Sequence, residues 1–569
     1  MTQDQRDQQR EDVPPEHGEA LLEATEALRD TLIERGIDVS DTIREDLARC
    51  RQSFALEPGW LDLEPLQEMH GRLVALSFRP HTANGASGAD GGDGKAQALG
   101  MLRPYVLELF HDLDEEPYAT MLVKGVAQTH AIKGGSFRLW LAQTLYRQRG
   151  SVGSEHALDA LVQLLAGEAQ FDGAKHEVFT RVGESGSANV IDLGTDEWSV
   201  IVIDGGAWSI VTESPVKFRR PRTAQALPTP VRGGSVDLLW KYVNVEEAYR
   251  PTVLAFVLAA FRPRGSYPFL ALQGEQGTAK SSAACFLKRL IDPSKAPLRA
   301  MPSNEVELAH AASHCHVLAL DNLSSISPNM SDALCRLSSG AGLGKRTLYT
   351  NNEEHVLEAK RPVIMTSITD IITRPDLADR TYHVPLTYIE PSKRRTEREL
   401  DEEFENDAPL ILGALLDAVA AAEVGMSTVS LSETPRLADA ARHAVAAEAA
   451  LGLAPGSMEQ ALIANSYHLD LVQLAAAPFT RALEALSNEG DCDLTPSELL
   501  VELRKRASVD ERDDYDFPRT TKALSQKLER IAPVLRRRGL EVRRHQTAGS
   551  NSQRRIELRR TDQAPSSGS

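Results

Sequence analysis

The sequence predicts an α/β fold built around a parallel sheet, and three observations support this prediction. Residues 265–390 alternate apolar, strand-like runs with helix-like runs, as α/β domains do. Within them, the apolar run Tyr267–Leu272 is followed by a Gly-rich loop and then by the helix-like run Ser282–Leu290. A second apolar strand, Val317–Leu320, ends in the carboxylate of Asp321. A strand that leads through a glycine loop into a helix is typical of phosphate-binding sites.

The Gly-rich loop follows the nucleotide-binding pattern Gly-x4-Gly-Lys-Ser/Thr, with Ala279 where the last Gly is usual. Backbone N–H groups at a helix N-terminus attract a polyphosphate, and glycines let the chain turn tightly enough to present them. Lys280 is expected to reach the β and γ phosphates of ATP, and Ser281 to bind Mg²⁺. The predicted nucleotide-binding residues are Gly274, Glu275, Gln276, Gly277, Thr278, Ala279, Lys280, Ser281 and Ser282.

The carboxylate that ends the second strand is the other predicted magnesium ligand. In a phosphate-loop enzyme a carboxylate at the C-terminal end of such a strand holds Mg²⁺, so Asp321 is expected to act with Ser281. The alternative is an ordinary aspartate that begins a turn. The next residue, Asn322, can orient a water molecule but cannot accept its proton. Either another residue acts as the base, or turnover is slow.

A third apolar strand, Pro362–Ile368, also ends in polar side chains. Thr366 and Ser367 are expected to lie near the γ phosphate as sensors of hydrolysis. A hydroxyl that only caps a buried strand is the alternative interpretation.

Arg380 completes the predicted catalytic set. An arginine supplied by a neighbouring subunit stabilises transition-state charge and makes hydrolysis depend on assembly. The alternative is a local salt bridge with Asp376 or Asp379, because charged pairs close in sequence are common.

The charge of the chain is unevenly distributed. The 569 residues carry a formal net charge of −18. Residues 516–560, however, hold 13 Lys and Arg against 4 Asp and Glu, a net of +9, which leaves −27 on the rest. This asymmetry predicts one anion-binding module on an acidic body, and a solvated basic tail is the alternative.

The basic segment has the pattern of a winged helix. A capping-type start at Thr495 opens one helix, and residues 520–531 form another with its apolar side chains on one face. Pro533 is expected to end or kink that helix, and Arg536–Arg544 and Gln553–Leu558 are expected to form two strands around a turn. In this arrangement the helix enters a major groove and the hairpin contacts phosphates. The side chains expected to contact DNA here are Lys522, Lys527, Arg530, Arg543, Arg544, Arg554 and Arg555.

Composition shifts divide the chain into six expected segments. These are a helical region with a disordered start and a Gly-rich linker (1–95), an α+β domain (96–230), the phosphate-loop core (231–425), a helical region (426–490), the winged helix (491–560) and a disordered tail (561–569).

The cysteines and the apolar runs bear on the expected cellular location of the protein. The five cysteines are scattered and show no zinc-ligand spacing, and their odd number without a signal peptide suits a reducing cytoplasm. The longest apolar run, Val253–Phe261, is shorter than the ~20 residues of a membrane span. A cytoplasmic protein without a membrane partner is therefore expected. The N-terminal hundred residues show no primase active site.

Four segments resemble, in their order, the ATPases of phage and plasmid helicases: LQGEQGTAKSS, VLALDNLSSI, KRTLYTNNEEHVLEAKRPVIMTSI and DLADRTYHVPL. The chain is similar to ATP-binding proteins of prophages and integrative elements, which are related to superfamily 3 and AAA+ replicative helicases. The resemblance covers roughly 100–560 and is concentrated in 267–390. It implies a P-loop AAA+ core and a pore hairpin at Gly340–Thr350, with Lys345 and Arg346 touching DNA. The family usually has Asn where this chain has Thr366.

Together these expectations describe an ATP-dependent DNA helicase or translocase for the replication of a phage, plasmid or integrative element. The resemblance implies a homo-oligomeric ring, expected to be a hexamer, acting on single-stranded or forked DNA beside a separate primase or initiator. An ATP-switched regulatory or defence protein without unwinding activity stays open, since weak hydrolysis at Asn322 suits a switch. A structural adaptor with a vestigial nucleotide site is the third class, and Lys280, Ser281 and Asp321 together argue against it.

Overall fold

The structure is a computed structural model, which describes residues 25–26, 51, 93–340, 343–346, 354–357, 360–476, 478–513, 517–537, 539–546 and 553–560. The predicted region 1–95 and the predicted tail 561–569 therefore lie largely or wholly outside the described residues. The described chain forms two compact units. The first holds the described residues up to Phe179 together with 196–198 and 212–220, and the second holds the remainder.

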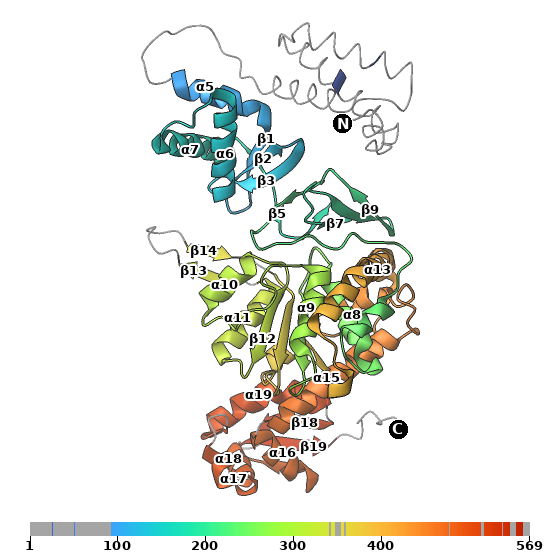
Figure 1. The fold of residues 1–569 in the computed structure, drawn as a ribbon. Helices are drawn as coiled ribbons and strands as arrows, with labels where there is room; N and C mark the ends of the chain where they lie inside the picture. The colour runs from blue at the N-terminus through green and yellow to red at the C-terminus, as the bar shows by residue number, and fades with distance from the viewer. Residues whose placement is uncertain are drawn as a thin grey trace. The chain divides into compact units, whose positions relative to one another are not determined.

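The first unit is an α+β domain. Its elements are α5 (Asp93–Leu102), η1 (Arg103–Tyr105), β1 (Val106–His111), β2 (Pro117–Val123), β3 (Val126–Ala131), α6 (Gly135–Arg149), α7 (Glu155–Phe171), β4 (Ala174–Lys175), β5 (Val178–Phe179) and β10 (Lys217–Phe218). Strands β1 to β3 form an antiparallel meander and β4 adds to β1 in parallel, while β5 and β10 form a separate parallel pair. Helices α5, α6 and α7 pack on the larger sheet (Figure 1). Phe137 and Leu141 of α6 are buried in the apolar core of this unit.

The second unit contains the remaining elements. Its strands are β6 (Val182–Ser185), β7 (Ala188–Asp192), β8 (Val200–Asp204), β9 (Ala207–Val211), β11 (Phe269–Gln273), β12 (Leu318–Leu323), β13 (Leu343–Arg346), β14 (Glu354–Leu357), β15 (Val363–Ser367), β16 (Thr381–Pro385), β17 (Cys492–Leu494), β18 (Leu540–Gln546) and β19 (Arg554–Arg560). Its helices are η2 (Val236–Lys241), η3 (Glu247–Tyr249), α8 (Arg250–Ala260), α9 (Lys280–Ile291), α10 (Glu305–Ser313), α11 (Pro328–Ser339), α12 (Pro375–Ala378), η4 (Pro391–Lys393), α13 (Glu397–Gly425), η5 (Met426–Thr428), α14 (Ala438–Ala446), α15 (Ser457–Ala476), α16 (Pro478–Asn488), α17 (Pro496–Arg506), α18 (Val509–Asp513) and α19 (Thr521–Arg537).

A parallel sheet with the strand order β12-β15-β11-β16 forms the centre of the second unit. A parallel bridge between Arg299 and Leu320 adds a short segment beside β12. Side chains along β11 alternate between two apolar cores: Leu270 joins the core packed by α8, α9 and α13, and Phe269 joins the core packed by α10 and α11. Burial on both faces explains the nearly continuous apolar runs of these strands. The three predicted strands correspond to β11, β12 and β15, and the predicted helix to α9, so these element predictions are confirmed.

The predicted α+β domain at 96–230 is divided between the two units. Strands β6 to β9 form an antiparallel sheet that belongs to the second unit, because its apolar side chains, including Ile203 and Trp208, join the core around α13. The indole nitrogen of Trp208 also donates to a carboxylate oxygen of Asp417 on α13, at 2.7 Å. Contacts between distant segments therefore decide where this sheet belongs, and the composition of 96–230 does not reveal them.

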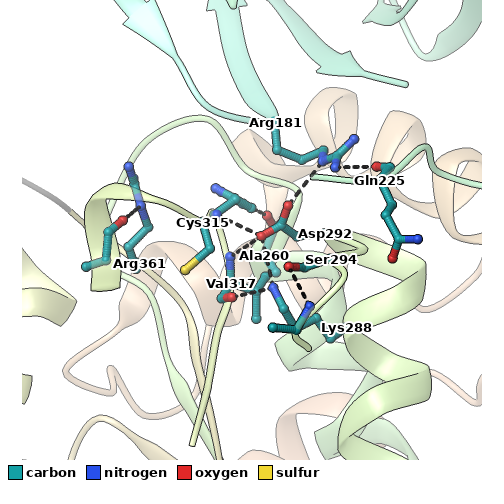
Figure 2. A network of polar contacts seen from close by, with 12 residues as sticks. Arg181, Gln225, Ala260, Lys288, Asp292, Ser294, Cys315, Val317 and Arg361 are labelled. Atoms are coloured by element: carbon teal, nitrogen blue, oxygen red, sulfur yellow. Dashed lines mark hydrogen bonds and ion pairs between the residues drawn. The ribbon is translucent and has the colours of Figure 1, made fainter. Parts of the chain in front are cut away.

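A buried polar network ties this small sheet to the end of the helix that follows the Gly-rich loop (Figure 2). Asp292, just after α9, accepts from the Arg181 guanidinium at 3.2 Å and from the Lys288 ammonium at 3.1 Å. The same carboxylate accepts the backbone N–H groups of His316 and Val317, which lead into β12, at 2.8 and 3.0 Å. Burial alone would raise the pKa of Asp292, but the charges of Lys288 and Arg181 overcome it and hold the pKa well below its usual range.

The helices of the second unit show two further features. Between η2 and α8 the chain leaves the helical conformation at Val245, which forms a β-bridge with Leu386. The apolar run Val253–Phe261 lies in and just after α8, and a longer helix is also rich in apolar residues. The segment Glu397–Thr428 is long and apolar enough to cross a membrane by length and composition, although half of its most apolar window is buried inside the protein. Its buried side chains join the core of the second unit, as those of a core helix do.

The C-terminal module begins earlier than the predicted boundary at 491. Phe479 and Leu483 of α16 belong to the same apolar core as α17, α19 and the β17-β19-β18 sheet. The predicted helix at 520–531 is observed as α19, but it continues through Pro533 to Arg537. The first strand of the hairpin therefore begins at Leu540 and not at Arg536.

Candidate nucleotide-binding site

The Gly-rich loop joins the end of β11 to the start of α9; close contacts favour glycine at position 274, and a left-handed backbone favours it at position 277. A Cβ on Gly274 would lie 2.7 Å from Thr278 Oγ1 and 3.1 Å from the Leu386 carbonyl oxygen. Gly277 has φ +93°, and its Cβ would lie 2.6 Å from a guanidinium nitrogen of Arg394. Thr278 of the loop itself and the Leu386 and Arg394 segment outside it thus leave little room for side chains at these two positions.

Ala279 occupies the position at which the motif usually has glycine. It caps the N-terminus of α9 with φ 60° and ψ 34°, in the left-handed region. A Cβ in that region costs roughly 1–2 kcal/mol. The chain therefore retains the backbone geometry of the motif and accepts local strain at this residue.

Lys280, the first residue of α9, folds back over the loop. Its ammonium donates to the carbonyl oxygens of Gly274 and Glu275, at 2.7 and 2.8 Å. Partial burial lowers the pKa of Lys280, and the carboxylates of Asp321 and Glu275 oppose this shift. The cation is thus held at the mouth of a loop whose backbone surrounds it, where it can exchange carbonyl partners for phosphate oxygens.

Ser281 and Asp321 lie together, as predicted. The Ser281 hydroxyl donates to Asp321 Oδ1 at 2.8 Å, and the hydroxyl of Thr366 on β15 donates to the same oxygen at 2.6 Å. The pairing of β12 with β15 is irregular between Leu320 and Leu323. Irregular pairing of this kind re-aims side chains near functional sites, and here Asp321 lies in the interrupted stretch.

Asn322 completes the irregularity. Its φ of 55° lies in the left-handed region, which Asn tolerates better than most residues, and its backbone N–H donates to Thr366 Oγ1 at 2.8 Å. Thr366 is 1% exposed, so its hydroxyl is committed to Asp321 and to the Asn322 backbone. The hydroxyl of Thr366 thus orients Asp321, a role that the sequence pattern did not reveal. Its predicted role as a γ-phosphate sensor stays a prediction.

Arg380 is largely buried. The residue is 7% exposed, and its guanidinium donates to the Asp376 carbonyl oxygen at 2.5 Å. Burial lowers the pKa of Arg380. A role on a neighbour's nucleotide stays a prediction, and it requires this side chain to become accessible at a subunit interface.

A two-stranded antiparallel pair overlaps the segment predicted to form a pore hairpin, but its second strand, Glu354–Leu357, lies beyond the predicted range Gly340–Thr350, and the pore role stays a prediction. Strands β13 and β14 pair antiparallel, with Lys345 opposite His355 and Arg346 opposite Glu354. The side chains of Lys345 and Arg346 lie outside the described part of the chain, as does the turn between the two strands.

The predicted DNA-contacting cations of the C-terminal module fall into two groups. Several are engaged within the module: Arg543 with Glu541, Arg544 with Glu529, Arg555 with Asp493, and Lys527 over the Phe479 ring. The second group is exposed and has no ion pair among the described residues. Its members are Lys522, Arg530 and Arg554.

The residues at the loop suit a magnesium ion. One serine hydroxyl and one carboxylate are hard oxygen donors, and Mg²⁺ in phosphate-loop sites uses few protein ligands and completes its shell with water and phosphate. The described residues contain no group of three or more His, Cys, Asp and Glu placed to hold a metal. The Ser281–Asp321 pair is therefore the candidate magnesium site, and it depends on a bound polyphosphate.

Comparisons with known proteins give the chain a family context. Residues 236–466 match the family model of an actinomycete integrative conjugative element replication protein, and residues 479–567 match the C-terminal domain of the same kind of protein, RepA. The second match begins within α16, in agreement with the observed start of the C-terminal module. No curated protein matches the chain.

Similar solved structures are two apo structures of the NrS-1 C-terminal region. The A form is 12% identical, with 80% of this chain and 96% of that chain covered at a TM-score of 0.36. The other is 11% identical, with 79% and 95% covered at a TM-score of 0.33. Because both family matches describe parts of one kind of protein and together span more than half of the chain, this chain is a replication protein of a mobile genetic element, of the integrative conjugative element type.

Proposed function

We propose that this replication protein is an ATP-dependent DNA helicase or translocase. One observation carries the proposal: Ser281, Asp321 and Thr366 meet at the C-terminal ends of neighbouring parallel strands, directly beside the Gly-rich loop. A phosphate loop, a magnesium pair and a third strand beside the loop strand are the parts of an ATP-hydrolysing motor. The proposed core is of the P-loop AAA+ or superfamily 3 type, which the strand order and the segment at Arg299 support.

The side chains of the site divide the chemical work. Loop N–H groups and Lys280 bind the phosphates, and Ser281 and Asp321 hold Mg²⁺, which when bound neutralises charge developing on the phosphates. The Thr366 hydroxyl keeps Asp321 aimed at Ser281. Asn322 can orient the attacking water but cannot take its proton, so the residues placed at the site support slow basal hydrolysis.

The DNA partner is proposed from the C-terminal module. Three helices packed on a basic hairpin support a winged-helix assignment, with Lys522, Arg530 and Arg554 as the accessible phosphate contacts. Assembly into a homo-oligomeric ring, with Arg380 serving a neighbour's nucleotide, belongs to the same proposal, as does a cytoplasmic location.

An ATP-switched DNA-binding regulator is the second candidate. Asn322 at the position of a usual base favours it, because a site that hydrolyses slowly can hold its nucleotide as a signal. The two candidates differ in one observable: a motor hydrolyses ATP faster on DNA, and a switch does not.

Steady-state ATP hydrolysis with and without single-stranded DNA tests the proposal. Wild-type protein is expected to hydrolyse ATP and to be stimulated by DNA, and Lys280→Ala to show no turnover. Lys295→Ala is the matched control, since Lys295 is exposed and lies just beyond the same helix. Equal turnover in wild-type and Lys280→Ala protein would remove the site assignment, and turnover without DNA stimulation would favour the switch.

A further inference from the structure

The segment that follows β16, residues 386–394, lies along the outside of the Gly-rich loop, and we refer to it as the strap. The Leu386 N–H donates to the carbonyl oxygen of Gln273, just before the loop, at 2.7 Å. The Ile389 N–H donates to the carbonyl oxygen of Gly277, within the loop, at 3.3 Å. The strap therefore follows the loop from its start to its tip.

The other side of the strap is fixed by Asn244. Its amide donates to the Thr387 carbonyl oxygen at 2.5 Å, and the Thr387 hydroxyl donates to its amide oxygen at 2.9 Å. The strap is thus held between the loop and the segment before η3. Side chains that it carries toward the loop are positioned in advance of a ligand, which lowers the entropic cost of binding.

Arg394 differs from the cations beside it. Lys393 pairs with Glu390, Arg395 with Glu403 and Arg398 with Glu402. Arg394, by contrast, has no ion pair in the described part of the chain. It turns toward the loop, so that a Cβ on Gly277 would lie 2.6 Å from its guanidinium.

Tyr388 fixes the direction of this guanidinium. The charged group lies 5.7 Å from the centre of the Tyr388 ring, and one of its nitrogens donates to the Tyr388 hydroxyl at 3.4 Å. A second nitrogen donates to the Ile389 carbonyl oxygen at 3.2 Å. These are neutral partners, so the positive charge of Arg394 is not cancelled. Arg394 is exposed and Tyr388 is 50% exposed, which leaves both accessible to a ligand.

We propose that Arg394 is a second phosphate-binding cation of the nucleotide site in the same subunit, positioned by Tyr388. The proposal rests on the proposed nucleotide site and names its ligand class more closely: a nucleoside di- or triphosphate whose outer phosphates reach the tip of the loop. A guanidinium that has no counter-charge attracts a ligand more strongly as the number of phosphate charges on the ligand rises. The contribution of Arg394 is therefore expected to rise from AMP to ADP to ATP.

Equilibrium titration calorimetry with AMP, ADP and a non-hydrolysable ATP analogue tests this proposal without turnover. In Arg394→Gln, affinity for ADP and the ATP analogue is expected to fall about ten-fold or more, as for the loss of a charge-assisted hydrogen bond. AMP affinity is expected to change less. Arg394→Lys retains the charge and should recover part of the loss, and Tyr388→Ala should weaken binding less than Arg394→Gln.

Arg398→Gln is the matched control, because Arg398 lies on the adjacent helix turn, is 87% exposed and pairs with Glu402. It is expected to bind all three nucleotides like wild type. Suppose that wild-type protein binds ADP and the ATP analogue, and that Arg394→Gln binds both as tightly as Arg398→Gln does. This result would overturn the inference about Arg394 and leave the proposed function standing. Wild-type protein that binds no nucleotide would overturn both.

A purely structural role for the strap gives a different result. In that case Arg394→Gln would lower the melting temperature, Arg394→Lys would not recover affinity, and the loss would be equal for AMP and ADP. This pattern would also contradict the proposal.

Discussion

At the scale of single residues, Asp321 has its position because two hydroxyls hold it. Ser281 on α9 and Thr366 on β15 both donate to Oδ1, while Asn322 in a left-handed conformation breaks the regular strand pairing beside it. A carboxylate that accepts two hydroxyls has few orientations left. Partners that orient a metal ligand without touching the metal commonly change affinity or activity by about 10- to 100-fold.

Thr366→Val is therefore expected to weaken the response to magnesium. Valine keeps the shape of the buried side chain but cannot donate to Asp321, so the Mg²⁺ concentration for half-maximal ATPase should rise about ten-fold. Nucleotide binding in EDTA should be unchanged. Thr381→Val is the control, because Thr381 is buried on β16 of the same sheet and donates to the Leu377 carbonyl instead. Identical magnesium titrations for wild type and Thr366→Val would contradict the orienting role.

Ala279→Gly tests the strain in the loop. Removal of the Cβ from a left-handed residue relieves roughly 1–2 kcal/mol, whereas the greater freedom of glycine in the unfolded chain costs about 0.4–1 kcal/mol. The variant is expected to be as stable as wild type or more stable, by up to about 1.6 kcal/mol, in urea unfolding. Ala283→Gly, at a buried helical position of α9, should be destabilised. A less stable Ala279→Gly protein would show that the left-handed conformation is not present.

At the scale of elements, the buried network around Asp292 links three parts of the second unit. It joins the end of α9, the start of β12 and the Arg181 segment that enters the small sheet (Figure 2). The helix that follows the Gly-rich loop, α9, is thereby connected at its C-terminal end to β6 and its neighbours. Asp332, which pairs with Arg374 at the surface, provides an exposed comparison.

Asp292→Asn should destabilise the protein by about 3–5 kcal/mol at neutral pH, because it leaves two buried cations without their counter-charge. Asp332→Asn should cost less than about 1 kcal/mol. The folded-state pKa of Asp292 is depressed, so its contribution is present above the unfolded carboxyl pKa of about 4 and is lost as pH falls below it. The difference between wild type and Asp292→Asn in chemical unfolding should narrow below that pH. A constant difference across the range would contradict the charged network.

The C-terminal module is a unit that starts at α16, so the placement of a truncation matters. A chain that ends at Ala476 should keep basal ATPase and lose duplex binding, with the log–log salt slope reduced by about 0.9 for each DNA phosphate that the protein no longer neutralises. A chain that ends at Asp513 should aggregate, because α16 and α17 would lose the apolar cover of α19. Full-length protein with Lys522, Arg530 and Arg554 changed to Gln should fold and show a reduced slope. If the chain that ends at Ala476 bound duplex DNA with the affinity and the salt slope of the full-length protein, the C-terminal module would not be the DNA-binding part of the protein.

At the scale of the whole molecule, the sequence predicted what is local and missed what depends on distant contacts. The loop, its flanking strand and helix, and the pairing of Ser281 with Asp321 follow from short patterns at the ends of apolar runs. Two features depend on the order of the strands in the sheet: the contact of Thr366 with Asp321, and the position of the strap. The sequence of a single strand does not reveal that order. The assignment of β6 to β9 to the second unit depends on partners such as Trp208 and Asp417, far apart in the chain.

The continuation of α19 through Pro533 has a similar cause. Proline disfavours a helix interior by about 3 kcal/mol, yet the leucines of α19 on both sides of it, Leu528 and Leu535, are buried in the core of the module. Tertiary packing therefore overrides the local preference. Because the helix continues to Arg537, the first strand of the hairpin begins at Leu540 and not at the predicted Arg536.

Strand displacement on forked DNA shows whether the protein unwinds DNA at the expense of ATP. Wild-type protein is expected to release the labelled strand when ATP and Mg²⁺ are present and not when ATP is omitted. Lys280→Ala should bind the fork with wild-type affinity and release no strand, because the change leaves the proposed DNA-binding module intact and removes the cation of the proposed nucleotide site. Wild-type protein that hydrolyses ATP and binds the fork tightly, yet releases no strand under any nucleotide condition, would contradict the helicase account and favour a nucleotide-switched DNA-binding protein.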